Sequence, residues 1–288
     1  MGASINVRAL LRAYGLRPKR TWSQNFLVDS AVIQAIAQHA TRGNPSVVVE
    51  LGAGLGVLTH MLAQGCPRVV AVERDRDLAR VLRSEFAGNS RVEILEDNAA
   101  TLDWRELCGR VGTPVVVGNL PYHMATPILF QVLEAGTLVG RFIFMFQREM
   151  AARLTAAPGG RPYGVLSIMA QQHAEIGRVM DVPPQAFFPV PKVHSTVLWF
   201  KPLPAPRVEV NDRELFSKIV RGAFSQRRKT IRNSLQAAFG GQIGKVGIER
   251  LLQRAGVSAT ARPEQLSIET FAKLSNIYNE SYPGNLDQ

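Results

Sequence analysis

Cysteine is scarce in this sequence, and so are residues spaced to bind a metal. The two cysteines, Cys66 and Cys108, stand far apart and outside any Cys-x-x-Cys pair. A disulfide framework or a thiolate zinc site is therefore not expected, and a reducing cytoplasm is the predicted compartment. The five histidines, at positions 39, 60, 123, 173 and 194, are scattered without metal-ligand spacing, so we expect no metal site.

Long apolar runs are also absent. The densest run, residues 142–146, has five residues, whereas roughly 18–20 are needed to cross a bilayer. The first 28 residues are basic but contain no continuous apolar stretch and no small-residue cleavage site. We therefore expect neither a signal peptide nor a membrane-bound protein.

Acidic residues are missing from the start of the chain, where five basic residues precede Asp29. Over all 288 residues, 34 lysines and arginines against 23 acids give a formal net charge of +11. Residues 201–288 carry +6 of this charge, so the last third is the more basic per residue. Such a surface attracts polyanions, most commonly nucleic acid. The hydrophobic fraction of 46% is that of a globular chain, which excludes disorder as its main state.

Short β-branched runs alternate with helical patterns between residues 29 and 203. Strands are predicted over 47–51, 68–73, 92–95, 114–118 and 142–146, and helices over 31–40, 55–63, 78–86 and 127–134. This alternation predicts an α/β fold, a doubly wound Rossmann-like sheet with helices on both faces. Two later strands, over 176–182 and 195–200, flank the loop PPQAFFPVPK and are interpreted as a pair at the sheet edge.

The last part of the chain has a different pattern. Residues 201–207 are rich in proline and resemble a linker, and residues 211–280 show helical spacing with helix stops at Gly240-Gly241 and Gly256. We therefore divide the chain into three parts. These are a basic N-terminal segment (1–28), a catalytic α/β domain (29–203) and a small helical domain (208–288).

A glycine-rich turn, Glu50-Leu-Gly-Ala-Gly-Leu-Gly, follows the first strand of the predicted sheet. A dinucleotide fingerprint would need a third glycine at position 57, which is Val57, so a dinucleotide-dependent oxidoreductase is not favoured. The pattern acid-x-Gly-x-Gly-x-Gly instead resembles the loop that binds S-adenosylmethionine (AdoMet). The amino and sulfonium groups of AdoMet are cationic, and a nearby acid suits that charge.

Acidic side chains end the next two strands. The carboxylate of Glu73 can accept hydrogen bonds from the vicinal hydroxyls of a ribose, and Asp97 can accept from an adenine amine. A solvated turn residue is the alternative for Asp97. The ordered series of Gly52, Glu73 and Asp97 after successive strands is more specific than any one of them.

The fourth strand leads into Asn119-Leu120-Pro121-Tyr122. This segment resembles the (Asp/Asn/Ser)-x-Pro-(Tyr/Phe) motif of methyltransferases that act on exocyclic amines of nucleic-acid bases. The Asn119 amide oxygen and the Leu120 carbonyl can accept both amine hydrogens, which directs the nitrogen lone pair at the sulfonium methyl. Pro121 fixes the local backbone, and Tyr122 offers a flat face to an unstacked base. Phe187 is expected to stack on the other face, with Phe188 as the second choice.

Five segments together resemble one family, the bacterial ribosomal RNA adenine dimethyltransferases. They are Ser23-Gln-Asn-Phe-Leu, the Glu50–Gly56 turn, Asn119-Leu-Pro-Tyr, Phe188-Pro-Val-Pro-Lys-Val and Phe224-Ser-Gln-Arg-Arg-Lys-Thr-Ile-Arg-Asn. The resemblance implies dimethylation of two adjacent adenosines near the 3′ end of 16S rRNA, coupled to maturation of the small ribosomal subunit. It also implies AdoMet, with S-adenosylhomocysteine as product, bound by Asn25, Leu27, Gly52, Gly54, Glu73, Asp97 and Asn119. We expect a monomer.

Basic residues in the helical domain are the candidate RNA contacts. They are Arg221, Arg227, Arg228, Lys229 and Arg232, which suit RNA phosphates; a solvated helix face is the alternative. Residues 8–20 are expected to form a second, mobile RNA contact or an unstructured tail.

Two other functions compete with this interpretation. One is a large-subunit rRNA adenine methyltransferase of the antibiotic-resistance type, against which the C-terminal segment argues. The other is a non-catalytic ribosome assembly factor, against which the intact Glu73, Asp97, Asn119 and Tyr122 argue. A zinc-dependent adenine deaminase is excluded because its His-x-Glu and Pro-Cys-x-x-Cys segments are missing.

Overall fold

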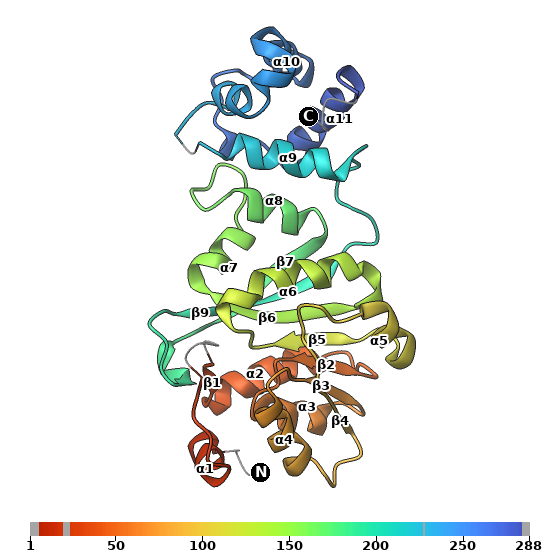
Figure 1. Cartoon of the computed structure of the whole chain (residues 1–288), viewed down its shortest axis with the longest axis vertical. Coiled ribbons are helices and arrows are strands. Elements are labelled where there is room, and N and C mark those ends of the chain that lie inside the picture. Colours follow the sequence, from red (N-terminus) through yellow and green to blue (C-terminus); the bar gives the residue numbers. More distant parts are fainter. Residues whose placement is uncertain (1–5, 20–23, 227, 284–288) are drawn as a thin grey trace. The chain divides into compact units, whose positions relative to one another are not determined.

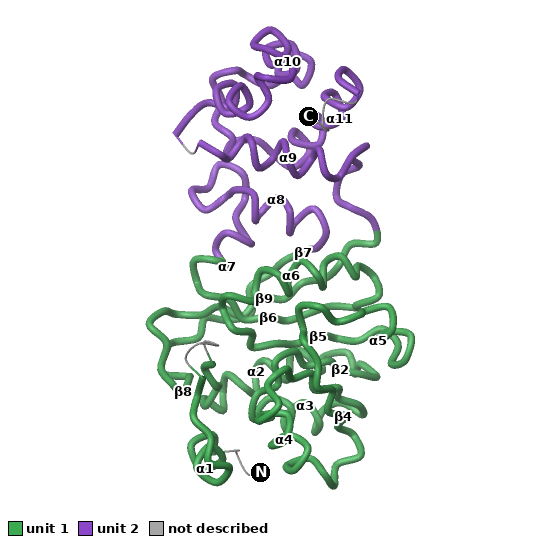
Figure 2. Tube along the Cα trace, viewed as in Figure 1, with its two compact units in different colours: residues 1–151, 175–204 green, residues 152–174, 205–288 purple. Residues whose placement is uncertain are grey.

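The computed structural model describes residues 6–19, 24–226 and 228–283 (Figure 1). The chain forms two compact units, the first made of residues 1–151 and 175–204 and the second of residues 152–174 and 205–288 (Figure 2). The expected division into 1–28, 29–203 and 208–288 differs in two segments, because 1–28 belongs to the first unit and 152–174 to the second. Tyr163 and Ile168 of that segment are buried in a core shared with the C-terminal helices, a packing that local sequence pattern does not encode.

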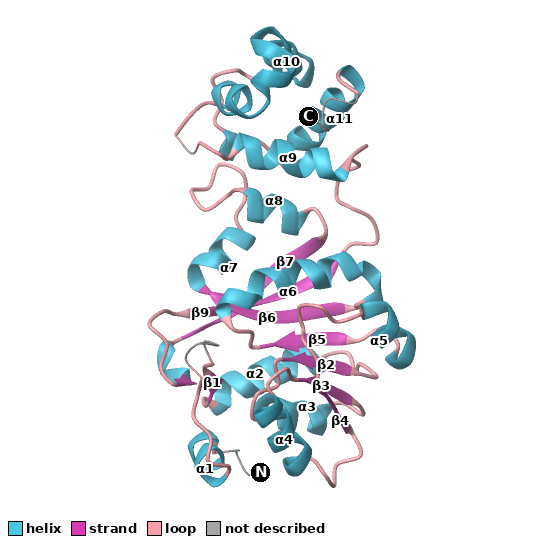
Figure 3. Ribbon diagram, in the orientation of Figure 1, coloured by secondary structure: helices cyan, strands magenta, loops and turns pink. Residues whose placement is uncertain are grey.

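The first unit contains a seven-stranded mixed sheet in the order β4-β3-β2-β5-β6-β9-β7 (Figure 3). Its strands are β2 (Val48–Leu51), β3 (Val69–Val72), β4 (Val92–Leu95), β5 (Val115–Gly118), β6 (Arg141–Gln147), β7 (Ala174–Val182) and β9 (Ser195–Pro202). The strands from β4 to β6 pair in parallel, and β9 pairs antiparallel with β6. The predicted late strand pair at the sheet edge is confirmed.

The central strands of the sheet are covered on both faces. Every residue of β2, β3 and β5 is buried, as expected for β-branched runs in a parallel sheet. From β2 the chain runs first to β3 on one side and later to β5 on the other. Such a switch point opens a crevice at the carboxyl ends of the strands, where ligands bind in open α/β sheets.

Helices of the first unit connect these strands. They are α2 (Ser30–Thr41), α3 (Val57–Gly65), α4 (Arg76–Glu85), α5 (Trp104–Val111), α6 (Tyr122–Ala135), the 3-10 turn η2 (Gly136–Leu138) and α7 (Arg148–Leu154), which crosses into the second unit. Helix α6 begins directly after Pro121 and contains Pro127, so it starts five residues earlier than predicted. None of the helices in the described ranges is long and apolar enough to cross a bilayer.

The N-terminal segment packs onto the first unit. Helix α1 (Val7–Ala13) buries Val7 and Leu11 against Phe26 and Leu78. Strand β1 (Phe26–Leu27) pairs antiparallel with β8 (Phe187–Phe188), which follows the 3-10 turn η3 (Pro184–Ala186). The alternative of an unstructured tail for residues 8–20 is therefore wrong for 8–19, and Arg20 lies outside the described residues.

The second unit is helical, as predicted. It contains α8 (Val165–Gln171), α9 (Arg213–Ala223), α10 (Ile231–Ala255), the 3-10 turn η4 (Pro263–Gln265) and α11 (Ile268–Ser281). The predicted stop at Gly240-Gly241 is wrong, because α10 continues to a break at Gly244, where φ is 68° and ψ is 174°. Burial of Phe239 and Ile248 on either side offsets the low helix propensity of the glycines. Gly256 ends the helix with a φ of 72°, as predicted.

Candidate active site

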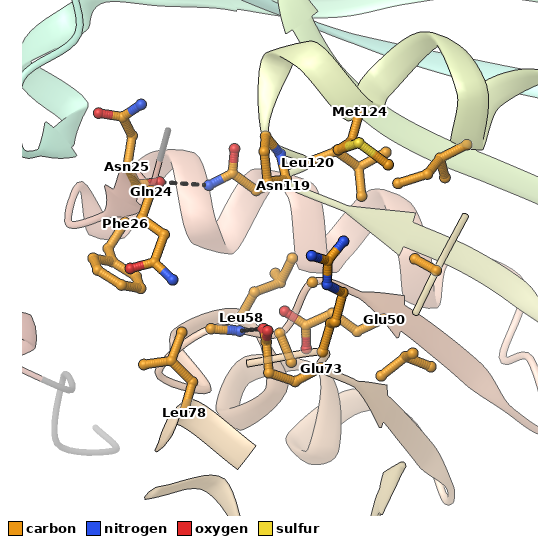
Figure 4. Close-up of a pocket in the computed structure, with 18 of the residues that line it drawn as sticks. Gln24, Asn25, Phe26, Glu50, Leu58, Glu73, Leu78, Asn119, Leu120 and Met124 are labelled. Atoms are coloured by element: carbon orange, nitrogen blue, oxygen red, sulfur yellow. Dashed lines mark hydrogen bonds between the residues drawn. The ribbon is translucent and has the colours of Figure 1, made fainter. Parts of the chain in front are cut away.

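A pocket of about 340 Å³ lies at the carboxyl ends of the central strands (Figure 4). Its volume is in the range of small-molecule sites. Each of four parallel strands contributes a residue just beyond its end: Gly52 after β2, Glu73 after β3, Asp97 beyond β4 and Asn119 after β5. The pocket brings together Asn25, Leu27, Gly52, Gly54, Glu73, Asp97, Asn119, Leu120, Pro121 and Tyr122, ten of the predicted cofactor and catalytic residues.

The glycine turn forms one wall of this pocket. Gly54 has a φ of +61°, and a Cβ atom there would lie 3.3 Å from the Phe26 ring. A larger residue would therefore meet both backbone strain and a steric contact with β1. The turn and the N-terminal segment are closely packed at this point.

The carboxylate of Glu73 is held by two backbone amides. Its Oε2 atom accepts from the amide of Gly54 at 2.8 Å, and its Oε1 atom accepts from the amide of Asp75 at 2.8 Å. Glu73 is only 8% exposed, and this burial raises its pKa. Each carboxylate oxygen has a second lone pair, so the group is oriented to accept two hydroxyls from a ligand in the pocket.

Asp97 lies next to Glu73 at the exposed rim of the pocket. Its amide donates to the Glu73 carbonyl at 3.2 Å, and its Oδ1 atom accepts from the amide of Asn98 at 2.6 Å. These bonds hold Asp97 beside Glu73 at the rim of the pocket. Two carboxylates therefore line this side of the pocket, and both can accept hydrogen bonds from a ligand.

A second buried acid, Glu50, also lines the pocket. It is 3% exposed, and its Oε2 atom accepts from the hydroxyl of Thr59 at 2.5 Å. Burial raises the pKa of Glu50 to about 8, with a smaller contribution from the neighbouring charge of Glu73. A cation bound in the pocket would favour the ionised carboxylate.

The carboxamide of Asn119 is oriented by the N-terminal segment. Its Nδ2 atom donates to the carbonyl of Asn25 at 3.1 Å, a bond between residues 94 positions apart (Figure 4). With the amide nitrogen engaged there, the Oδ1 atom is the group that accepts hydrogen bonds in the pocket. Sequence position alone could not predict this orientation.

Tyr122 begins α6 and is anchored to strand β9. Its hydroxyl lies 2.8 Å from the Oγ atom of Ser195 at the start of β9. The ring is half-buried, and burial raises the pKa of the phenol, so it is neutral at ordinary pH. Pro121 has a φ of −54°, within the range that its ring imposes.

Phe187 is not brought together with the other predicted residues. Its side chain is 2% exposed and packs in the core with Leu27 and Val182, because strand β8 pairs with β1. Phe188 is half-buried, and the guanidinium of Arg8 lies 4.7 Å from its ring centroid. Neither ring lines the pocket, so the expectation that Phe187 stacks on the base requires a rearrangement of β8 and stays a prediction.

Several pocket residues were not predicted from the sequence. They are Gln24, Phe26, Leu55, Val57, Leu58, Arg74, Leu78, Ala99, His123, Met124 and Ile128. Gln24 and Phe26 lie in the motif at 23–27, which is the signal that could have found them. The others are backbone neighbours of motif residues or core side chains whose access to the pocket depends on packing.

The candidate RNA contacts lie in the second unit. Arg221 is in the last turn of α9, and Arg228 and Lys229 precede α10; all three are exposed. Arg232 is half-buried in the first turn of α10, and Arg227 lies outside the described residues. Within the described ranges, no three His, Cys, Asp or Glu side chains gather as a metal would require.

The strand order and the pocket at the carboxyl ends of the strands are those of a Rossmann-like methyltransferase. Two solved structures share the fold. One is a dimethyladenosine transferase from Plasmodium falciparum, with a TM-score of 0.75 at 22% identity over 88% of this chain and 98% of that chain. The other is the 23S rRNA methyltransferase ErmE, with a TM-score of 0.65 at 26% identity over 91% and 100%.

The chain belongs to the ribosomal RNA adenine dimethylase family, whose model matches residues 15–280. Two similar proteins are named ribosomal RNA small subunit methyltransferase A. The one from Geobacter sulfurreducens is 43% identical over 92% of this chain and 96% of its own length. The one from Desulfitobacterium hafniense is 42% identical over 99% of both. The predicted family, fold class and enzyme class, an AdoMet-dependent rRNA methyltransferase, are thereby confirmed.

Proposed function

We propose that this chain transfers methyl groups from AdoMet to the exocyclic amines of two adjacent adenosines in 16S rRNA of the small ribosomal subunit. The orientation of the Asn119 carboxamide is the observation that carries the proposal. Its nitrogen is engaged by the Asn25 carbonyl, so its oxygen is available for an amine hydrogen. Eight relatives that are 41–45% identical support the small subunit as substrate, since each is named ribosomal RNA small subunit methyltransferase A.

The pocket residues fit AdoMet as methyl donor. Glu73 would accept the ribose hydroxyls, Asp97 the adenine amine, and Glu50 would face the cationic end of the ligand. When bound, AdoMet supplies a sulfonium-activated methyl group and leaves as S-adenosylhomocysteine. The two amide bonds to Glu73 support this assignment, because they orient the carboxylate before any ligand arrives.

The segment from Asn119 to Tyr122 would hold the adenine amine. This amine is a poor nucleophile because its lone pair is delocalised into the purine ring. The Asn119 oxygen and the Leu120 carbonyl would accept its two hydrogens, favouring a pyramidal nitrogen with its lone pair on the donor side. The Tyr122 ring, anchored by Ser195, would support the face of the base. Phe187 would cover the opposite face once β8 has opened.

Positioning and electrostatics would account for most of the rate. The methylated amine is a cation, and it is acidic enough to lose its proton to water. No side chain with a strongly basic free form is therefore required next to Asn119. Because the acceptor must be unstacked, single-stranded or flipped adenosines are the expected substrate.

The second unit would supply contacts to RNA phosphates. Arg228 and Lys229 are exposed in the connection between α9 and α10, and Arg221 is exposed in the last turn of α9. Phosphate contacts position a protein on RNA without reading sequence. We further propose that the chain acts as a monomer in the cytoplasm, without a metal, during maturation of the subunit.

Methyl-transfer mapping tests the proposal. Labelled AdoMet is incubated with the protein and with under-methylated small subunits, and separately with large subunits, and the labelled nucleotides are mapped. We expect two adjacent adenosines near the 3′ end of 16S rRNA to be dimethylated. Label in large-subunit RNA alone would identify the antibiotic-resistance type. Subunit binding without label, in a preparation that binds AdoMet, would identify an assembly factor.

A further inference from the structure

A cluster of charged and polar groups lies at the start of α4, next to the donor pocket. The Nζ atom of Lys19 is 2.8 Å from Oδ1 of Asp75 and 2.9 Å from Oδ2 of Asp77. Gln24 joins them twice: its Nε2 atom donates to Oδ2 of Asp75 at 3.0 Å, and its Oε1 atom accepts from the amide of Lys19 at 2.9 Å. The side chains of these four residues have no role in the chemistry described so far.

Asp75 is buried to a degree that capping a helix does not require. Its side chain is 3% exposed, although it caps α4 through a bond from the amide of Asp77 at 3.1 Å. The capping Asp103 of α5, by contrast, is exposed. A buried carboxylate is costly unless it is paired and hydrogen-bonded, and here Lys19 and Gln24 supply both. Lys19 is charged throughout the ordinary pH range, because hydrogen bonds to the two carboxylates raise its pKa.

The same cluster is connected to both ends of the reaction site. On one side, the amide of Asp75 donates to Oε1 of Glu73, the proposed ribose acceptor. On the other side, the residue after Gln24 is Asn25, whose carbonyl orients the Asn119 carboxamide. Residues 24–27 all line the pocket between these two points.

We propose that Lys19 and Asp75 are positioning residues, which hold residues 24–27 across the donor pocket and keep Glu73 aligned with the ribose of AdoMet. This inference rests on the AdoMet-dependent function proposed above. Neither residue touches the reacting atoms. Removing the Lys19 charge leaves Asp75 buried with less compensation, which weakens the attachment of Gln24, while the β1–β8 pairing and the Asn25–Asn119 bond remain.

Binding of S-adenosylhomocysteine, measured by calorimetry, tests the proposal in the full-length protein. Lys19→Met is expected to weaken binding at least about fivefold and to raise KM for AdoMet, with kcat at saturating donor changed less than about twofold. Lys19→Arg is expected to restore most of the affinity, because it restores the charge. Asp75→Asn keeps the helix cap and is expected to weaken binding to a similar degree. If the two residues act as a pair, the double variant binds no more weakly than Asp75→Asn alone.

Arg68→Met is the matched control. Arg68 forms an ion pair of similar distance and exposure, 2.9 Å to Glu93 with 40% of its side chain exposed, against 38% for Lys19. It precedes β3, at the end of the strand away from the pocket, so we expect unchanged affinity. Wild-type affinity in Lys19→Met, additive losses in the double variant, or an equal loss in Arg68→Met would overturn the proposal. A wild-type protein that binds no S-adenosylhomocysteine would instead overturn the proposed donor.

Discussion

Single side chains in this pocket are oriented by backbone groups before substrate arrives. Glu73 is held by two amides, and Asn119 is held by a carbonyl from a segment 94 residues away. Such preorganisation is the main source of electrostatic catalysis, because the groups need no rearrangement in the transition state. The reactivity assigned to Asn119 therefore depends on β1 as much as on its own motif.

Asn119→Ala removes the oxygen proposed to accept an amine hydrogen. We expect single-turnover methyl transfer to fall by about 10²–10³-fold, as for loss of one preorganised hydrogen-bonding group. The melting temperature should change little, because the side chain is only half-buried at the pocket wall. Near-normal methyl transfer at saturating AdoMet would contradict the role of Asn119.

Glu50 links stability, pH and donor binding. Its pKa is about 8 in the folded protein because of burial, whereas an unfolded glutamate has a pKa of about 4.3. Between these values the folded state holds a proton that the unfolded state has released, so stability is lost as pH rises through this window. Glu50→Gln is therefore expected to flatten the fall in melting temperature between pH 5 and 8. At pH 7 we expect a gain in unfolding free energy of about 1–3 kcal/mol.

The same substitution should weaken S-adenosylhomocysteine binding, because the amino group of the ligand loses an anionic partner. Thermal unfolding curves and calorimetry over this pH range provide the measurements. If the melting temperatures of the wild type and of Glu50→Gln fall equally as pH rises from 5 to 8, Glu50 does not titrate as described.

Among the elements, the strands of the sheet were the best predicted. Each run of buried β-branched residues became a strand within a few residues of the expected bounds, because a parallel strand covered on both faces needs a continuous apolar sequence. Helices α1, α5, α7 and α8 were not predicted. They are seven or eight residues long, and helices of this length depend on tertiary packing more than on propensity.

Helix α10 offers a matched pair of glycines. Gly241 is inside the helix and Gly244 is at its break, with a φ of +68°, and a Cβ atom at either would meet no neighbour within 4 Å. Gly241→Ala is expected to stabilise the second unit by about 0.5–1 kcal/mol. Gly244→Ala is expected to destabilise it by about 1–3 kcal/mol, because an L-residue is strained there. Chemical denaturation measures both, and equal effects of the same sign would contradict the assigned backbone break.

At the scale of the whole molecule, the two units divide the proposed work. The donor pocket lies in the first unit, and the exposed basic residues Arg221, Arg228 and Lys229 lie in the second. Substitutions in the pocket of the first unit should therefore affect donor binding. Substitutions of the basic residues in the second unit should affect RNA binding and leave donor binding unchanged.

The double substitution Arg228→Gln with Lys229→Gln is expected to weaken small-subunit binding. The slope of the logarithm of the binding constant against the logarithm of salt concentration should become shallower by about one for each charge removed. Affinity for S-adenosylhomocysteine should not change. Lys218→Gln with Arg254→Gln is the control, since it removes two charges already paired with Glu214 and Glu280. Binding measured over a range of salt concentrations separates the variants, and an unchanged slope in the first would place the RNA contact elsewhere.

The amino-acid sequence by itself determined the strand runs, the glycine turn, the acids after successive strands and the Asn-Leu-Pro-Tyr segment, because these features depend on neighbouring residues along the chain. Only the tertiary structure decided how Asn119 is turned, that Phe187 is buried, and that residues 152–174 join the helical unit. It also decided that Lys19 meets Asp75 across 56 positions. These features arise from pairing between distant segments, and their free energy comes from contacts that no local pattern contains.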